Sequence, residues 1–187
     1  ELGDESPVTC GSDNFANQLY GHASGSVSTW NQNRSDIVST RSGTIENMST
    51  TSDGILLSLE GGIVELLDND ANPIWEHQLN NPIVNAMVGF EVTSSPSVWI
   101  LYRTTIGGGL LVCDAASGQK LATFELKSHP TALLCFDKYT VVSTIQGSIF
   151  LIESNIFQRR ITEAPESSDN DQNDQRSQMM AKLRKLR

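Results

Sequence analysis

The chain has 187 residues, of which 38% are hydrophobic and 19% charged, and its net charge is −9 at neutral pH. This length suffices for one substantial core, and the abundance of Ser, Thr, Asn, Gln and Gly is typical of turn-rich β structure rather than of a helical bundle. The acidic balance argues against a nucleic-acid-binding protein, and no apolar run reaches the roughly 18 residues that a transmembrane segment requires.

The first segment, residues 1–21, is polar, with weak apolar content at Phe15, Leu19 and Tyr20. We expect it to form a loop or a partial strand. It has neither the basic region nor the apolar region of a signal peptide.

A repeated pattern starts after this segment. Four times a glycine opens a short, largely apolar run that ends six residues later in Asp, Asn or Glu: residues 25–31, 62–68, 108–114 and 147–153. The starting glycines lie 37, 46 and 39 residues apart. A repeat of about 40 residues built from short strands is the signature of a β-propeller, in which four-stranded blades stand side by side. We therefore predict an all-β fold, with propeller blades over residues 22–163.

The strands of these units are separated by turn formers such as Gly61, Gly62 and the segment 68–73. The predicted strands of the last three units are 54–59, 63–67, 74–79, 83–92, 98–102, 110–113, 121–126, 131–136, 139–145, 148–152 and 156–161. In each unit the final strand is the more polar one, as expected at the rim of a propeller. The first unit lacks convincing first and second strands, so we predict three full blades and part of another.

The composition changes after Glu163. Residues 164–175 contain many acids and no large apolar side chain, which predicts a disordered linker. Residues 176–187 are basic, and Met179, Leu183 and Leu186 fall at positions i, i+4 and i+7. This spacing predicts a short amphipathic C-terminal helix.

The three cysteines, Cys10, Cys113 and Cys135, are an odd number without close spacing and so do not indicate a disulfide framework. Cys113 and Cys135 lie in apolar runs and are interpreted as small buried hydrophobic residues. This favours a reducing compartment, the cytoplasm or the nucleus. Glycosylation triplets at Asn33 and Asn47 keep a luminal or secretory location open as the alternative.

We predict no metal site. His22, His77 and His129 lie far apart in turns or outer strands, and we interpret them as solvent-facing turn residues. Residues 68–72 resemble the start of a calcium loop, but Pro73 stands where that loop needs glycine, so a solvated turn is the better interpretation.

Catalytic and cofactor-binding motifs are also missing from the sequence. The serines of residues 49–52 do not form a Gly-x-Ser-x-Gly motif. The glycines of residues 107–109 are followed by neither a helix nor a lysine, and a hairpin turn explains them better than a phosphate-binding loop. We therefore predict that the protein is not an enzyme and has no cofactor.

Candidate partner-binding residues come from exposed aromatic and basic positions. Trp99 lies between apolar neighbours and is expected in the core, whereas Trp75 lies on an alternating strand and is the best candidate for an exposed anchor. The basic clusters could dock on an acidic partner or on a membrane surface. The partner-binding candidates are Trp75, Arg159, Arg160, Met179, Lys182, Leu183 and Leu186.

The third-strand endings carry a family resemblance. Trp30-Asn31, Leu67-Asp68, Cys113-Asp114 and Ile152-Glu153 stand where WD40 repeats often have Trp-Asp. Residues 114–120 resemble the Asp-x-x-x-Gly-Lys turn of that family, and residues 74–76 resemble the fourth strand of quinoprotein-like repeats. The chain thus resembles WD40 and quinoprotein-like propellers over roughly residues 22–163.

Several features depart from that pattern. Only one unit has the Trp of Trp-Asp, the Gly21-His22 pair lies too close to it, and no blade has the family's buried Asp/His/Ser/Trp network. Four units are also fewer than the six to eight blades of most members. The resemblance therefore implies a degenerate propeller, and two alternatives explain the low count: the chain is part of a larger propeller, or loops are absent from it.

Together these features favour a non-enzymatic protein–protein interaction scaffold, a subunit or fragment of a larger assembly whose partners are other protein chains that complete or cap the propeller. The alternative is a luminal or extracellular sensor or ligand-binding quinoprotein-like domain. A third possibility, a quinone-dependent oxidoreductase, would require a polar, metal-bearing funnel for which the sequence offers no residues.

Overall fold

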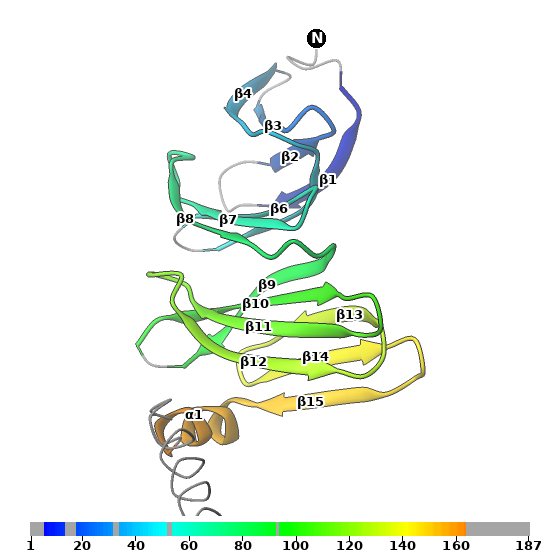
Figure 1. Ribbon diagram of the computed structural model, residues 1–187. Helices are drawn as coiled ribbons and strands as arrows, with labels where there is room; N and C mark the ends of the chain where they lie inside the picture. Colours follow the sequence, from blue (N-terminus) through cyan, green and yellow to red (C-terminus); the bar gives the residue numbers. More distant parts are fainter. Residues whose placement is uncertain (1–5, 14–17, 32–33, 52–53, 93, 164–187) are drawn as a thin grey trace, which may run out of the picture.

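Four antiparallel sheets follow one another along the chain and stack face to face, as the computed structural model shows for residues 6–13, 18–31, 34–51, 54–92 and 94–163 (Figure 1). We call the sheets blades 1 to 4. Blade 1 contains β1 (Val8–Asp13), β2 (Gln18–His22), β3 (Ser26–Asn31) and β4 (Arg34–Thr40); blade 2 contains β5 (Ile45–Thr50), β6 (Ile55–Leu59), β7 (Ile63–Leu67) and β8 (Pro73–Gln78). Blade 3 contains β9 (Ile83–Glu91), β10 (Pro96–Arg103), β11 (Gly108–Asp114) and β12 (Lys120–Leu126); blade 4 contains β13 (Pro130–Cys135), β14 (Tyr139–Thr144) and β15 (Ile149–Glu153), and α1 (Ser154–Glu163) follows.

Neighbours in sequence are neighbours in each sheet, so every blade is a meander joined by tight turns. The β6–β7 turn requires Gly61 and Gly62, whose φ angles are +88° and +83°. In the β7–β8 turn, the Asp68 carboxylate accepts hydrogen bonds from the backbone N–H groups of Asp70 and Asn72 at 2.9 and 2.8 Å. These bonds fix the turn and confirm that this acidic segment is a structural turn.

The core consists of three layers, each between two successive blades. Alternate residues of β10 show how one strand serves two layers: Val98 and Ile100 pack toward blade 2, whereas Trp99 and Leu101 pack toward blade 4. Because both faces of the inner strands are covered, these strands are continuous apolar runs rather than alternating ones. Each fully buried aliphatic side chain stabilises the stack by roughly 1.5–3 kcal/mol.

The all-β partial propeller is confirmed, but two predicted segments are wrong. Residues 8–13 and 18–22, expected to be a loop or a partial strand, form β1 and β2, so blade 1 is complete. Residues 156–161, expected to be the fourth strand of the last blade, belong to α1. The partial blade is therefore the last one rather than the first.

The physical reason for the helix is the spacing of its apolar side chains. Phe157 is buried and Ile161, four residues later, packs against the same core layer, as on one face of a helix. The predicted linker, residues 164–175, and the predicted basic helix, residues 176–187, lie outside the described residues. Within the described residues, no helix is long and apolar enough to cross a membrane.

Candidate interaction surface

The last blade exposes an apolar face. β13, β14 and β15 turn one set of alternate side chains toward blade 3, where Leu133 and Val142 are fully buried. The opposite set points away from the stack. Leu134, Ile149 and Leu151 in this set are 51%, 73% and 58% exposed. We call this surface the end face; its residues are Leu134, Tyr139, Val141, Ile149 and Leu151, with Phe136 and Ile145 in the adjoining turns.

Cross-strand pairing aligns the end face into a continuous row. Leu134 pairs with Val141, and Val141 pairs with Leu151, so three aliphatic side chains stand side by side across the sheet. The corresponding outward face of blade 3 carries Trp99, Leu101 and other apolar side chains that blade 4 buries. The end face therefore has the chemistry of a blade-to-blade contact, and the described part of the chain contains no further blade beside it. Contiguous apolar patches on protein surfaces are candidates for interaction sites.

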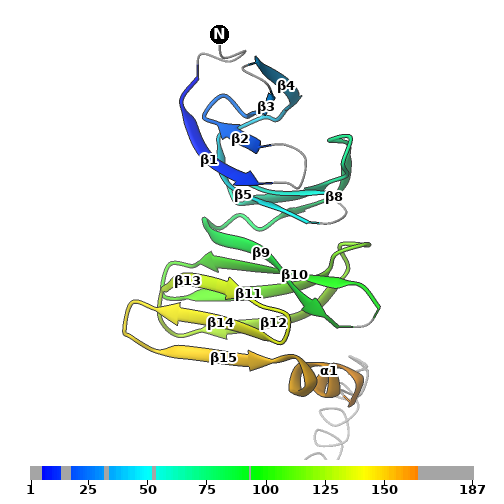
Figure 2. The same ribbon diagram turned by 180° about the vertical axis from the view of Figure 1, so that it is seen from behind.

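The place of the end face in the fold is visible in two views. Figures 1 and 2 show β15 and α1 at the opposite end of the stack from the N-terminus. α1 follows β15 directly and inserts Phe157 between blade 3 aromatics, at ring distances of 5.8 Å from Phe90, 5.1 Å from Trp99 and 6.0 Å from Phe124. The helix thus packs into the core layer between blades 3 and 4, and the side chains of the end face stay exposed.

A groove of about 960 Å³ lies next to α1 and crosses blades 2, 3 and 4. Ile74, Phe90 and Phe136 contribute apolar walls, and Glu91 and Lys138 contribute charges. The side-chain amide of Gln158 on α1 donates a hydrogen bond of 2.7 Å to the backbone carbonyl of Glu91 and fixes the helix at the rim. The described lining thus combines apolar walls with charged side chains.

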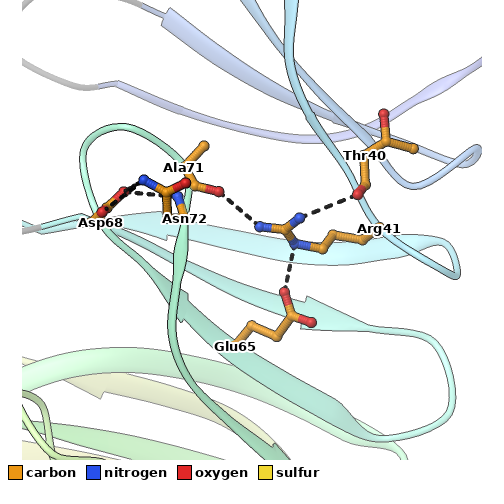
Figure 3. A network of polar contacts seen from close by, with 6 residues as sticks. All are labelled: Thr40, Arg41, Glu65, Asp68, Ala71 and Asn72. Carbon is orange, nitrogen blue, oxygen red and sulfur yellow. Dashed lines mark hydrogen bonds and ion pairs between the residues drawn. The ribbon is translucent and has the colours of Figure 1, made fainter.

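A largely buried ion pair lies at the contact between blades 1 and 2 (Figure 3). Arg41 Nε lies 2.7 Å from Glu65 Oε2 on β7, and the guanidinium donates to the carbonyls of Ala71 at 3.0 Å and Thr40 at 3.2 Å. Burial raises the pKa of Glu65, the nearby Arg41 lowers it, and the carboxylate of Glu76 raises it further. Burial is the largest of these effects, so the group titrates above its ordinary range.

Trp75 is not the exposed anchor that the sequence suggested. Its side chain is half-buried, and its indole N–H donates a hydrogen bond of 2.7 Å to the carbonyl of Ala115 in blade 3. A Cβ at Gly118 would lie 2.7 Å from the Trp75 ring, so the β11–β12 turn packs directly on the indole. The expectation of exposure is therefore wrong: Trp75 joins blade 2 to blade 3.

The other predicted positions divide into three groups. Trp99 is fully buried as expected, and its indole N–H donates to Ser97 Oγ at 2.8 Å. Arg159 and Arg160 are exposed on α1. The remaining candidates, Met179, Lys182, Leu183 and Leu186, lie outside the described residues.

The three histidines are not solvent-facing, which corrects the sequence interpretation. His22 is 1% exposed, and its Nε2 lies 2.7 Å from Ser28 Oγ. His77 Nε2 and His129 Nδ1 lie 2.7 and 2.9 Å from backbone carbonyls of neighbouring hairpin turns. The imidazole of His22 joins two strands of blade 1, whereas those of His77 and His129 bond to turns that are distant in the sequence. Among the described residues, no three His, Cys, Asp or Glu side chains are grouped as a metal site would require.

The described cysteines are unpaired thiols. Cys113 is fully buried in the layer between blades 2 and 3, and burial raises its pKa to about 11. Cys135 is partly buried against the layer between blades 3 and 4, and burial raises its pKa to about 11 as well. The prediction that these two side chains act as small hydrophobic residues agrees with their positions.

Sequence reasoning missed the end face and the groove. Residues 131–152 have the same apolar pattern as the preceding blades, and the pattern alone gives no sign that one face lacks a neighbour. The available signal was the i, i+4 spacing of Phe157 and Ile161, which shows that the last unit ends in a helix instead of a polar outer strand.

Comparison with known proteins shows the fold alone. No protein-family model matches the chain, and no curated protein matches it. The computationally designed Ika4 protein is similar with a TM-score of 0.62 at 17% identity, over 82% of this chain and 95% of the designed one. BamB from Moraxella catarrhalis gives a TM-score of 0.60 at 13% identity, over 81% of this chain and 48% of BamB. The WD40 β-propeller domain of Doa1 gives 0.61 at 10% identity, over 80% and 52%. The chain thus has the fold of propeller blades and spans about half the length of BamB and of the Doa1 structure.

Proposed function

We propose that the protein is a non-enzymatic interaction scaffold, and that its end face binds another protein that continues the blade stack. The observation that carries this proposal is the alternation in blade 4, where one face is buried like the faces of blades 2 and 3 and the other is exposed with the same chemistry. Burying apolar side chains contributes about 25 cal/mol for each Å² removed from water. A partner that covers the row from Leu134 to Leu151 gains this stabilisation.

The length comparison with BamB and Doa1 supports a role in an assembly, whereas the chain spans 95% of the designed Ika4 protein. The blades match about half of BamB and of the Doa1 structure, and a stack that does not close has an end that needs a cover. The scaffold role follows the common use of propellers, which hold loops in fixed positions for protein partners. Fold similarity alone does not define a function, so the proposal depends on the end face.

The proposal also covers the family origin and the compartment of the protein. The turn at residues 114–118, in which the Asp114 carboxylate accepts a hydrogen bond of 2.9 Å from the N–H of Ser117, supports a WD40-like or quinoprotein-like origin. The unpaired thiols of Cys113 and Cys135 support a reducing compartment, the cytoplasm or the nucleus. Occupied glycans at Asn33 or Asn47 would instead favour the luminal, ligand-binding alternative.

The test compares two variants of the full chain in cells that express it. Leu134→Glu combined with Leu151→Glu places two charges on the end face, whereas Ile106→Glu places one on the exposed β10–β11 turn. We expect proteins that co-purify with the wild type to be retained by Ile106→Glu and reduced at least tenfold, about 1.4 kcal/mol, by the double variant. Unchanged thermal melting of both variants is the control for folding. Equal retention by both variants would contradict the proposal.

A further inference from the structure

Blade 4 lacks the outer strand that the other blades have. β3, β7 and β11 each pair with a following strand, namely β4, β8 and β12. Among the described residues, β15 pairs with β14 alone, because the chain turns into α1 at Ser154. One edge of β15 therefore has no strand beside it in the described part of the chain.

The backbone groups at this edge can be assigned from the hairpin. Ser148 accepts a hydrogen bond across the β14–β15 hairpin, and Ser154 donates one. Because hydrogen-bonding direction alternates along an antiparallel strand, the even-numbered residues of β15 face β14. The N–H and C=O groups of Ile149, Leu151 and Glu153 point to the open edge.

The first four residues of this edge strand carry neither charge nor proline, and the only charged residue of β15, Glu153, is its last. Residues 149–152 are Ile-Phe-Leu-Ile, and their pairing with β14 contains no bulge. The outer strands of blades 2 and 3 differ, because β8 carries Glu76 and β12 carries Lys120 and Glu125. An exposed, regular edge without charge over residues 149–152 is a template for strand addition.

The side chains also leave space for a further strand. Phe150 pairs with the fully buried Val142 and faces blade 3 with it, yet Phe150 is 45% exposed. The residues that face the preceding blade from β11, Leu111 and Cys113, are 6% and 0% exposed. The difference arises because β12 flanks β11, whereas nothing described flanks β15 beside Phe150.

We propose that a partner polypeptide adds an extended strand antiparallel to β15 and completes blade 4. This inference rests on the proposed function, and it specifies how the partner of the end face is held. The outer strands already present define the partner segment: like β12, it carries apolar residues at alternate positions, as Phe124 and Leu126 do, with polar or charged residues between them. Main-chain hydrogen bonds supply the affinity and the alternate side chains supply specificity.

The remaining residues of this chain do not fit that description. Residues 164–175 contain no large apolar side chain. In residues 176–187 the apolar side chains Met179, Leu183 and Leu186 are spaced by four and three rather than by two. Residues 164–187 therefore do not match the strand that β12 exemplifies.

The test measures amide hydrogen exchange in the full chain by NMR. A peptide with the sequence of residues 119–127, which spans β12, is added to about 1 mM, a concentration that detects weak binding. We expect exchange at Ile149 and Leu151 to slow at least tenfold, whereas Phe150 and Ile152 are already bonded to β14 and stay unchanged. The same peptide with alternate amides N-methylated should have no effect. Leu151→Pro removes one outward donor while sparing the β14 ladder, a place where sheets tolerate proline, and should abolish the protection.

Two results would overturn the strand proposal: exchange at Ile149 and Leu151 that the peptide does not change, and protection that rises with protein concentration alone, which would assign the edge to a second copy. The N-methylated peptide keeps the test decisive if Leu151→Pro does not fold. If Leu151→Pro folds and retains the partners that the end-face double variant loses, the scaffold proposal stands and strand addition fails.

Discussion

Replacement of Phe157 by alanine tests how α1 holds the open end of the stack. Phe157 is 4% exposed, and its ring contacts Phe90, Trp99 and Phe124 at centroid distances of 5.8, 5.1 and 6.0 Å. Removing a buried phenylalanine side chain costs about 3–5 kcal/mol. α1 has 10 residues and, like isolated helices of this length, has little stability without packing.

These values lead to a specific expectation. The variant can undock α1 and hydrate the gap, which limits the loss to about 3 kcal/mol, the lower end of the range for a buried phenylalanine. For a protein of this size each kcal/mol lowers the Tm by about 2–4 °C, so the melting temperature should fall by about 10 °C. Urea titration followed by Trp fluorescence measures the loss, because Trp99 adjoins the substituted ring.

The matched control is Ile156→Ala, one residue earlier on the same helix, where the side chain is 41% exposed. We expect that variant to lose less than about 1 kcal/mol, as surface substitutions commonly do. If Phe157→Ala lost no more than the control, the packing of α1 on blade 3 would be refuted.

Three further predictions concern the blades themselves. Gly62→Ala should destabilise the protein more than Gly61→Ala. Both positions have a positive φ, which costs a non-glycine residue about 1–2 kcal/mol. A Cβ at Gly62 would in addition lie 2.3 Å from a backbone oxygen, whereas a Cβ at Gly61 would have no atom within 4 Å. The native protein keeps a proton on Glu65 at pH values where the unfolded chain has lost it. The free energy of unfolding should therefore fall as the pH rises from 4.5 through the raised pKa, and Glu65→Gln should make stability less dependent on pH in that range. Cys113 and Cys135, with pKa values of about 11, should react with iodoacetamide at pH 7.5 much more slowly than after unfolding in urea, as mass spectrometry can measure; rapid labelling of the native chain would contradict their burial.

Regular features of the fold could be predicted because they depend on local chemistry. The glycine-initiated runs mark the third strands because a tight turn before each strand needs glycine at positive φ, as at Gly25, Gly62 and Gly147. Trp99 could be assigned to the core because apolar residues flank it on both sides. Strands that are buried on both faces leave such continuous apolar signals in the sequence.

Polar strands and contacts between distant residues could not be predicted in this way. β1 and β2 consist mainly of polar residues, and their pairing is supported by bonds such as that from Thr9 Oγ1 to the carbonyl of Gly21 at 3.0 Å. The burial of His22 depends on Ser28 across a hairpin, and the burial of Trp75 depends on a turn 40 residues away. Sequence periodicity carries no information about such partners.

The end face shows the same limit most clearly. Leu134 and Leu151 have the local pattern of buried blade residues, and their exposure results from where the described stack ends. Whether an apolar strand face is covered depends on the next sheet rather than on the strand itself. The open edge of β15 likewise follows from the turn into α1 at Ser154.

Site-specific photo-crosslinking in cells would test the central claim most directly. A photoreactive amino acid is placed at Leu134 on the end face, and, as the control, at Ile106, which is 88% exposed in the β10–β11 turn. The account predicts a discrete higher-mass product, formed between two different proteins, from position 134 and none from position 106. No product from position 134, or equal products from both positions, would contradict the claim that the end of the blade stack is an interface.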